Sequence, residues 1–290
     1  MDGFISGGRL ESTGIGLDDE KDVRGELRDY ILLSFLFSWI VSVPLAASHT
    51  GLLAAALPRS LSFLASFGPS LAAVTLSYRD GGVSGVRRLL TGLFRWRVNL
   101  VWYAVALFGP ATAGAAAILM EAWLCGGPAI SIVEGVWPGI LPVFLLVLLL
   151  GGPLGEETGW RGYALPRLLK RHDPTMSSLL LGVVWWAWHL PLFWVEGSPQ
   201  SELPMLGFMA QILGTSIIYT WIYRGTGGSV LLPMLFHASG NTVAGFMPFL
   251  PLEQTGGSTT AFRLFLLIIW TAASAITLYD AVKPRGRASP

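Results

Sequence analysis

Residues 139–161 read GILPVFLLVLLLGGPLGEETGWR, and this stretch decides the fold class. Its first part, 139–155, contains no charged side chain. Because a helix rises ~1.5 Å per residue, about 20 apolar residues cross the ~30 Å hydrocarbon core of a bilayer. Extended back to residue 135, the run is therefore predicted to span a membrane. It ends directly at Glu156, Glu157 and Arg161.

Seven further stretches of comparable length carry no charge or a single one. They cover 30–47, 60–78, 101–120, 174–195, 203–223, 228–250 and 260–279. Hydrophobic residues make up 52% of the chain and charged residues only 13%, whereas soluble domains carry about 25% charged residues. That deficit favours lipid over a soluble protein with eight buried core helices. The sequence thus predicts an all-α, polytopic membrane protein with about eight transmembrane helices.

Basic residues gather in alternate loops of this arrangement. They are Arg79, Arg87, Arg88, Arg95 and Arg97 after the second span, Arg167, Lys170 and Arg171 after the fourth, Arg224 after the sixth, and Lys283, Arg285 and Arg287 after the eighth. Short loops rich in Lys and Arg face the cytoplasm, so both termini are predicted to be cytoplasmic. The expected organisation is a cytoplasmic segment 1–29, a membrane domain 30–280 with its core at about 137–245, and a cytoplasmic tail 281–290.

The rest of the composition excludes other classes. A net charge of +1 gives no support for a nucleic-acid partner. The lone Cys125 leaves no disulfide framework and no cysteine-based zinc site. The first ~30 residues are polar and acidic, so no cleavable signal peptide is expected.

Three of the predicted spans carry polar groups that indicate function, because ionisable residues inside a membrane are energetically costly. These groups are Glu156, Glu157 and Arg161 on the fourth span, His189 on the fifth, and His237 and Asn241 on the seventh. Glu157 and Arg161 are four residues apart, so they share a helix face and can pair. Glu156 then points about 100° away around the helix. His237 and Asn241 are also four apart and project together.

Taken together, these groups fit hydrolysis of a peptide bond within lipid. A carboxylate and a histidine can hold and deprotonate water, while an imidazole and an amide can stabilise an oxyanion. Taken singly, each has a structural alternative: headgroup-level charges for the glutamates, packing for His189, and an interhelical hydrogen-bonding pair for His237 and Asn241. Other chemistries fit less well, since no H-E-x-x-H helix is present and no predicted span holds a G-x-S-G motif.

At these residues the chain resembles the CAAX-protease and bacteriocin-processing family of intramembrane peptidases, often abbreviated CPBP or Abi. The family pattern is E-E-x-x-x-R, then F-x-x-x-H, then H-x-x-x-N. The matching positions are Glu156, Glu157 and Arg161, then His189, then His237 and Asn241. Trp185 stands where the family usually has Phe. The resemblance covers roughly residues 137–245, with the motifs in the family's order.

The resemblance implies an α-helical membrane fold whose cavity opens to the cytoplasm and the membrane, and it implies endopeptidase activity. We expect no cofactor. The implied roles are water activation by Glu156 and His189, oxyanion stabilisation by His237 and Asn241, and support of the site by Glu157 and Arg161. The substrate would be a peptide or protein, with or without a lipid modification. We expect the protein in the plasma membrane of a prokaryote, in contact with membrane lipid, with its active site facing the cytoplasm.

Three alternatives stay open. Glu156, His189 and His237 could form a zinc set of one carboxylate and two histidines, although Asn241 suits an oxyanion better than zinc. The same groups could serve a proton- or ion-coupled transporter, against which the sequence shows no internal repeat. The chain could also be an inactive family member that acts as a scaffold or immunity protein.

The depth of the three groups adds one structural expectation. At ~1.5 Å per residue, His189 and His237 lie ~14–18 Å inside the cytoplasmic boundary. Glu156 would lie only a few Å inside it if the fourth span begins near residue 137. The groups can meet if that span continues as a helix through Tyr163 to Leu169, and we expect this continuation.

Overall fold

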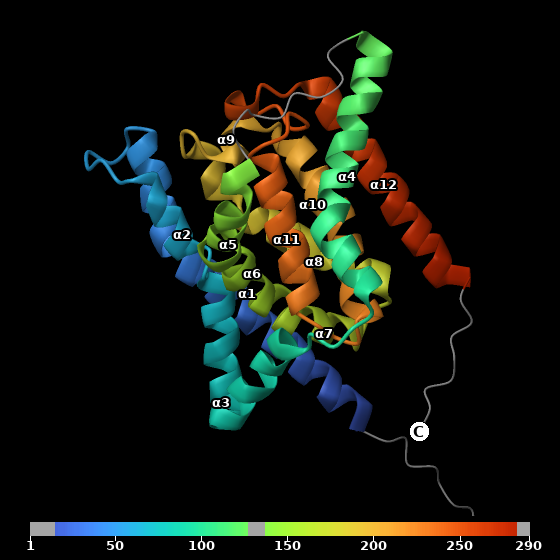
Figure 1. The fold of residues 1–290 in the computed structure, drawn as a ribbon. Helices are drawn as coiled ribbons and strands as arrows, with labels where there is room; N and C mark the ends of the chain where they lie inside the picture. Colours follow the sequence, from blue (N-terminus) through green and yellow to red (C-terminus); the bar gives the residue numbers. More distant parts are fainter. Residues whose placement is uncertain (1–14, 127–136, 283–290) are drawn as a thin grey trace, which may run out of the picture.

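The computed structural model describes residues 15–126 and 137–282, and every element in these ranges is helical (Figure 1). The predicted all-α class is thereby confirmed. In chain order the α-helices are α1 Ile15–His49, α2 Ser62–Ala65, α3 Gly68–Thr91, α4 Leu100–Cys125, α5 Ile140–Leu150, α6 Pro153–Gly159, α7 Leu165–Leu169, α8 Pro174–Trp188, α9 Pro199–Glu202, α10 Met205–Gly225, α11 Leu231–Ala244 and α12 Thr259–Val282.

Within the described residues, six helices are long and apolar enough to cross a membrane, and the bent pair formed by α5 and α6–α7 would be a seventh. The protein is thus a multi-pass membrane protein, as predicted. The stretch 228–250, expected to be a span, appears as α11, which has only 14 residues. Gly227 and Gly228 adopt positive φ angles of 64° and 90° before it, so the helix begins late. The number eight stays a prediction.

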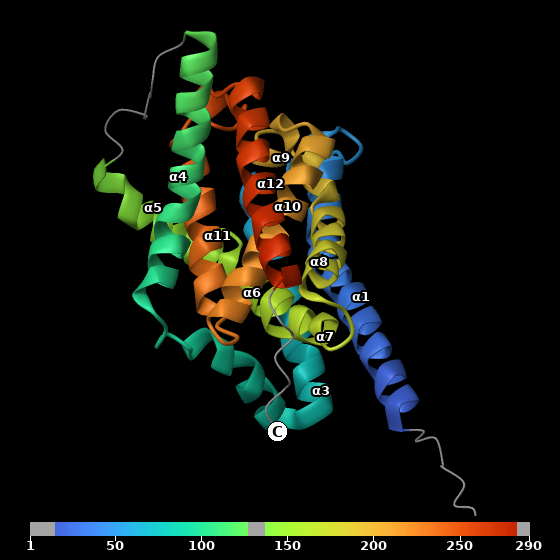
Figure 2. The same cartoon turned by 90° about the vertical axis from the view of Figure 1, so that its right-hand side faces the viewer.

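The two ends of the bundle differ in what they contain. The start of α1, the bend of α3, helix α7 and the end of α12 lie at one end, while α9, the end of α4 and the start of α12 lie at the other (Figures 1 and 2). Helix α1 begins at Ile15, well before residue 30, because the polar residues ahead of the span continue the helix. The predicted tail 281–290 falls almost entirely outside the described residues.

The predicted continuation of the fourth span is confirmed. Helix α6 is followed by a π-helical turn (η4, Trp160–Ala164) and then by α7, which ends at Leu169. The break lies instead before α6, where the chain bends by 42°. Gly152 absorbs the bend with φ 113°, a conformation that side chains with a Cβ rarely adopt. Glu156 therefore lies deep in the bundle, at a depth where it can meet His189 and His237.

Helix α6 lies at the centre and packs against α3, α5 and α11. The approach is close because α6 is rich in glycine: a Cβ at Gly155 would lie 2.5 Å from the Ser66 carbonyl oxygen. Below it, the rings of Tyr30 and Trp160 meet edge to face at 5.6 Å, and Tyr30 stacks on Tyr163 at 5.0 Å. Glu156 and Glu157 are thus fixed by a rigid core.

Candidate active site

Glu156 lies in the first turn of α6 and faces a cavity. Its backbone N–H donates to the Gly152 carbonyl at 2.8 Å. A Cβ at Gly152 would lie 2.5 Å from Glu156 Oε1, so glycine is required there for the carboxylate to keep its position. The indole Nε1 of Trp185 donates to Glu156 Oε2 at 2.7 Å. One carboxylate oxygen is therefore held by a neutral donor.

Glu157 points the other way, into the core, as the helical spacing predicted. Arg161 Nη1 lies 3.0 Å from the Glu157 carboxylate, and both side chains are fully buried. The guanidinium lies between two aromatic faces, 4.5 Å from the Trp185 ring centre and 4.1 Å from that of Tyr219. Arg161 thus neutralises Glu157 in a site that water does not reach, and stacking holds its plane.

Glu157 has a second partner that the sequence did not indicate. His237 Nδ1 lies 2.8 Å from Glu157 Oε1. Because an ionised carboxylate only accepts hydrogen bonds, Nδ1 carries the hydrogen and Nε2 is the nitrogen left for other contacts. Glu157 therefore connects the Arg161 pair to the histidine of the third motif and fixes the orientation of its ring.

His189 is positioned by the end of α8, where it forms the C-terminal cap. Its Nδ1 lies 2.8 Å from the Trp185 carbonyl oxygen. A carbonyl only accepts, so Nδ1–H is the donor and Nε2 of the neutral ring has a free lone pair. The ring is packed edge to face against Trp188 at 4.7 Å and Phe208 at 5.2 Å. His189 is therefore set up to accept a proton at Nε2.

His237 and Asn241 leave α11 on the same side, as predicted. Ser239, between them, turns away and donates to the Leu107 carbonyl of α4 at 2.6 Å. His237 is buried, whereas Asn241 is exposed. Both line the cavity that Glu156 faces. The amide of Asn241 is thus presented to the space in which a substrate would lie.

The cavity has a volume of about 740 Å³ and unites the predicted groups. Glu156, His189, His237 and Asn241 all line it, while Glu157 and Arg161 lie behind its wall. Trp185 stands among the three ionisable groups, with its ring centre 5.8 Å from that of His189 and 5.6 Å from that of His237. Most other lining side chains are apolar. Three helices therefore deliver their polar groups to one apolar chamber.

Residues 137–243 match the family described as "Type II CAAX prenyl endopeptidase Rce1-like". This segment contains every motif residue from Glu156 to Asn241. The resemblance predicted from the motifs is confirmed. The chain is also 33% identical over 146 residues to "CAAX prenyl protease 2" of Methanococcus maripaludis. The aligned part is 48% of this chain and 50% of the relative, so the chain spans about half the length of the curated relative it matches.

Trp185 is the residue whose contribution the sequence did not reveal. In the second motif it stands where the family usually has Phe, and the sequence alone suggested that either aromatic ring would fill the same space. The structure shows a difference in chemistry, because only the indole N–H can donate to Glu156. One feature of the sequence could have indicated this role: Trp185 departs from the family pattern at a position one helical turn before His189.

Glu156, His189 and His237 are not arranged as a zinc site. Among residues 15–126 and 137–282, no three His, Cys, Asp or Glu side chains lie close enough together to hold a metal ion. Each histidine is held through Nδ1, by the Trp185 carbonyl and by Glu157, and has Nε2 free. Histidines that bind a metal are held in the same way, so only the spacing of the three side chains counts against a metal. In this arrangement the three side chains do not converge on one metal position. No step proposed below passes through a metal.

Proposed function

We propose that this protein is an intramembrane endopeptidase whose reaction resembles that of CAAX prenyl proteases. The observation that carries the proposal is the single cavity shared by Glu156, His189, His237 and Asn241. These residues come from three different helices, and chance packing would not gather them in a chamber whose other lining is mostly apolar. The matched segment 137–243 contains all of them.

In the proposed reaction, Glu156 and His189 activate a water molecule. Glu156 offers the carboxylate oxygen that Trp185 does not occupy, and His189 offers the lone pair on Nε2. Together they orient the water and take its proton as it attacks the scissile carbonyl. The proton is then available for the leaving amine. The low exposure of both groups keeps bulk water from competing for these contacts.

His237 and Asn241 stabilise the oxyanion that forms on the attacked carbonyl. The amide NH₂ of Asn241 is a ready donor at the cavity surface. For His237 Nε2 to donate as well, both ring nitrogens must carry protons, and Glu157 is placed to stabilise that cation. Glu157 and Arg161 act only through His237 and through the packing around it. They are positioning residues in this scheme.

The substrate in this proposal is a peptide or protein with its scissile bond in an extended segment, since a helix would hide the carbonyl in its own hydrogen bonds. The apolar chamber is compatible with substrates that carry a lipid chain and with those that do not. We place the protein in the plasma membrane of a prokaryote, surrounded by lipid. A transport path is less well supported, because the core beneath Glu156 is filled by the buried side chains of Trp160 and Arg161.

The test is cleavage of prenylated and unprenylated peptide libraries by the purified protein, with Glu156→Gln as the inactive control. We expect cleavage by the unaltered protein, none by the variant, and no change on adding a chelator. Loss of activity with a chelator and its return with metal would refute the metal-free scheme. A purified, folded protein that cleaves no peptide in either library would refute the proposed function.

A further inference from the structure

A second, smaller cavity lies at the α7 end of the bundle and shares no lining residue with the cavity of the candidate active site. Its volume is about 220 Å³, which is room for a group much larger than one water molecule. Helix α3 bends at Gly81 and Gly82, where the backbone leaves helical geometry and Gly82 adopts φ 56°. Residues on both sides of this bend line the cavity, and residues of η4 and α7 complete its wall. The bend of α3 therefore creates the space.

Arg88 on α3 and Arg167 on α7 bring two guanidinium groups to this cavity. Among the described residues Arg88 has no carboxylate partner, and its Nη1 lies 3.5 Å from Ser84 Oγ, at the limit of a hydrogen bond. Arg167 donates through Nε to Glu26 and through Nη1 to the Tyr163 carbonyl at 3.0 Å. Neither contact uses Arg167 Nη2. Each arginine therefore has N–H groups left for a ligand, and guanidinium groups bind phosphate oxygens strongly.

A buried hydroxyl without a partner also belongs to this cavity. Tyr163 is 1% exposed and lines the cavity, and its hydroxyl has no hydrogen-bond partner among the described residues. Its ring stacks on Tyr30 at 5.0 Å, and the guanidinium carbon of Arg167 lies 3.4 Å from the ring centre. Because its faces are covered in this way, Tyr163 meets the cavity with its edge, where the hydroxyl is. Burying a hydroxyl without a partner is costly, so an acceptor bound in the cavity would remove that cost.

The charges around the cavity leave one positive charge unbalanced. The nearby carboxylates each have an arginine partner, in the pairs Asp80–Arg79, Asp29–Arg28 and Glu26–Arg167. Arg88 is the arginine of the lining that remains, so a singly charged anion would neutralise the cavity. Asp80 also lines the cavity, and it uses Oδ1 in its pair with Arg79. Its Oδ2 can accept a hydrogen bond from a ligand hydroxyl.

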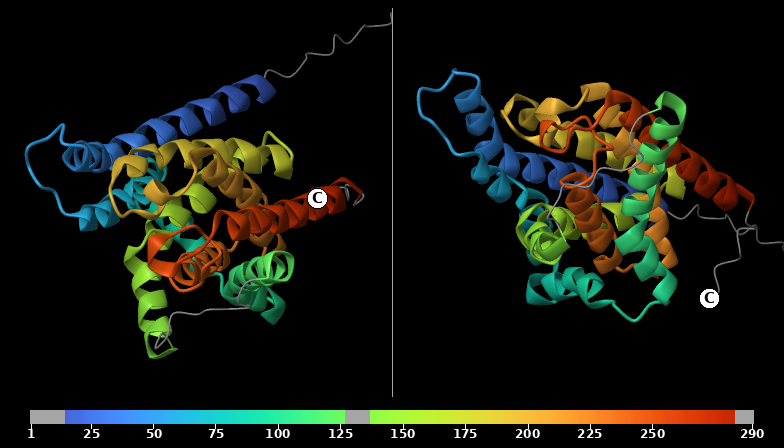
Figure 3. Two further views of the ribbon diagram at one scale, coloured as in Figure 1. Left: turned by 90° about the horizontal axis from the view of Figure 1, so that it is seen from above. Right: turned by 45° about the horizontal axis from the view of Figure 1, so that its top comes forward.

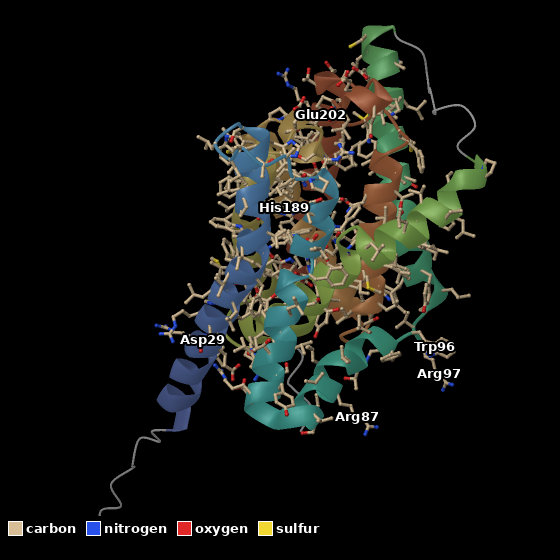
Figure 4. All side chains as sticks on the ribbon, turned by 90° about the vertical axis from the view of Figure 1, so that its left-hand side faces the viewer. Asp29, Arg87, Trp96, Arg97, His189 and Glu202 are labelled. Atoms are coloured by element: carbon tan, nitrogen blue, oxygen red, sulfur yellow. The ribbon has the colours of Figure 1, made fainter. Side chains whose placement is uncertain are left out.

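The surface beside the cavity has the character of a membrane boundary. The chain that follows α3 exposes large apolar side chains, with Phe94 76% and Trp96 58% exposed. Arg97 lies beside Trp96, with its guanidinium carbon 5.1 Å from the ring centre. Exposed tryptophan next to arginine is typical of segments that lie at the level of lipid head groups. Figure 4 shows Trp96 and Arg97 at the same end of the molecule as Asp29, with Glu202 at the opposite end. The cavity therefore lies at the end of the bundle where lipid phosphates are expected.

From these observations we infer that the cavity binds a phosphate group. Arg88, Arg167 and the Tyr163 hydroxyl donate to the phosphate oxygens, and Asp80 accepts from a hydroxyl of the same molecule. A phosphodiester carries a single negative charge, which matches the one unbalanced arginine. The head group of an anionic phospholipid with free hydroxyls has all of these features, whereas inorganic phosphate offers the phosphate oxygens alone. The inference does not depend on the proposed function, because none of these residues lines the cavity of the candidate active site.

A ligand in this cavity also contacts the segment behind the catalytic groups. Gly162 and Tyr163 follow Arg161 directly in the π-helical turn η4, and Arg161 pairs with Glu157 in the core. A phosphate held by α3, η4 and α7 at once fixes this turn from outside. A ligand that binds the folded protein and not the unfolded chain raises its stability. We therefore expect the bound phosphate to raise the thermal midpoint.

The first test measures binding by the purified whole chain in a neutral detergent at fixed ionic strength. Short-chain phosphatidylglycerol, short-chain phosphatidylcholine and inorganic phosphate are titrated separately, and the thermal midpoint is recorded at each concentration. We expect a saturable rise with phosphatidylglycerol and a much smaller one with phosphatidylcholine, whose choline cancels the charge. An equal rise with inorganic phosphate would also support the phosphate site and would identify free phosphate as its ligand. An equal rise with phosphatidylcholine, or no saturable rise with any probe, would overturn the inference.

Three variants separate this cavity from general attraction by surface charge. Tyr163→Phe removes only the unpartnered hydroxyl, so the midpoint without ligand should stay the same while the apparent Kd for phosphatidylglycerol rises by roughly tenfold or more. Arg88→Gln should raise this Kd by a similar factor. Arg87→Gln is the matched control, since it removes the same charge from an exposed neighbour on α3 that does not line the cavity. Its Kd should change by no more than about threefold.

Equal losses of affinity in Arg87→Gln and Arg88→Gln, or an unchanged Kd in Tyr163→Phe, would refute a phosphate site in this cavity. Peptide cleavage is not measured in either test. A failure of the proposed function is therefore distinguishable from a failure of the phosphate site.

Discussion

Helices α5 and α6 form the two halves of one bent membrane segment. The apolar half, α5, is not buried in the protein, whereas the polar half, α6, is. Helix α5 consists only of apolar residues and proline, yet none of its residues is buried. Helix α6 holds two glutamates, a threonine and two glycines, and all but Leu154 of its residues are buried. Figures 2 and 3 show α5 at the edge of the bundle. In lipid the most apolar stretch can face outward, because hydrocarbon solvates it as well as a protein core does.

The comparison predicts that the buried polar half, α6, supplies the catalytic carboxylate. The largest loss of activity should therefore follow substitution of Glu156. Glu156→Gln keeps the size of the side chain but removes the ability to accept a proton. We expect hydrolysis to fall by at least about 10³-fold, near the upper range for loss of a general base. Initial rates on a cleavable library peptide would measure this. The thermal midpoint in detergent should stay close to that of the unaltered protein, and rapid cleavage by a folded variant would remove Glu156 from its assigned role.

The neighbouring carboxylate should behave differently, since Glu157 is part of the core. Glu157→Gln leaves Arg161 buried without a counter-ion, and breaking a buried pair in this way costs about 3–5 kcal/mol. We expect a large fall in thermal midpoint, together with weaker activity because His237 loses its orienting partner. Glu156→Gln is the matched control for the melting experiment. A stable Glu157→Gln protein that is inactive, beside an active Glu156→Gln protein, would reverse the roles of the two glutamates.

Asn241→Ala should lower the rate without affecting the fold. The amide is exposed to the cavity, and removing one oxyanion donor typically reduces kcat by about 10²–10³. The effect should appear in kcat more than in KM, because the donor acts on charge that develops only in the transition state. Thr242→Val is a matched control, since its hydroxyl has no hydrogen-bond partner and does not line the cavity. Equal rate losses in both variants would point to a structural effect.

Trp185→Phe restores the residue that is usual in the family and removes the donor to Glu156. Hydrogen bonds to charged groups contribute about 1.5–3 kcal/mol, so we expect kcat to fall by roughly ten- to a hundredfold with KM little changed. Trp188→Phe removes an indole N–H that has no partner and should leave kcat near its original value. An unchanged kcat in Trp185→Phe would show that the hydrogen bond does not position the carboxylate.

Sequence reasoning reached the site more completely than the architecture around it. The i, i+4 spacing placed Glu157 on Arg161 and turned Glu156 away, as found. Spacing within one helix says nothing about contacts between helices, so the Glu157–His237 contact and the Trp185 donor stayed hidden. Hydropathy likewise finds an apolar run without telling whether it spans the bilayer. For this reason α11 was expected to be a full span, and the outward-facing position of α5 was not foreseen.

The smallest effect should come from α5, and it completes the comparison. Leu146 is 52% exposed on that helix. In the folded protein its side chain meets lipid, and it would meet lipid again if the bundle came apart within the membrane. Leu146→Ala should therefore change the unfolding free energy by no more than about 0.5 kcal/mol. Leu165→Ala is the matched control, because Leu165 on α7 is fully buried and its truncation should cost about 2–5 kcal/mol. The thermal or denaturant midpoints of the two variants, measured in the same detergent, test this difference. Equal losses of stability would mean that α5 packs as tightly as the buried half of the segment. The apolar surface of α5 would then be an interface within the protein and not its boundary with lipid.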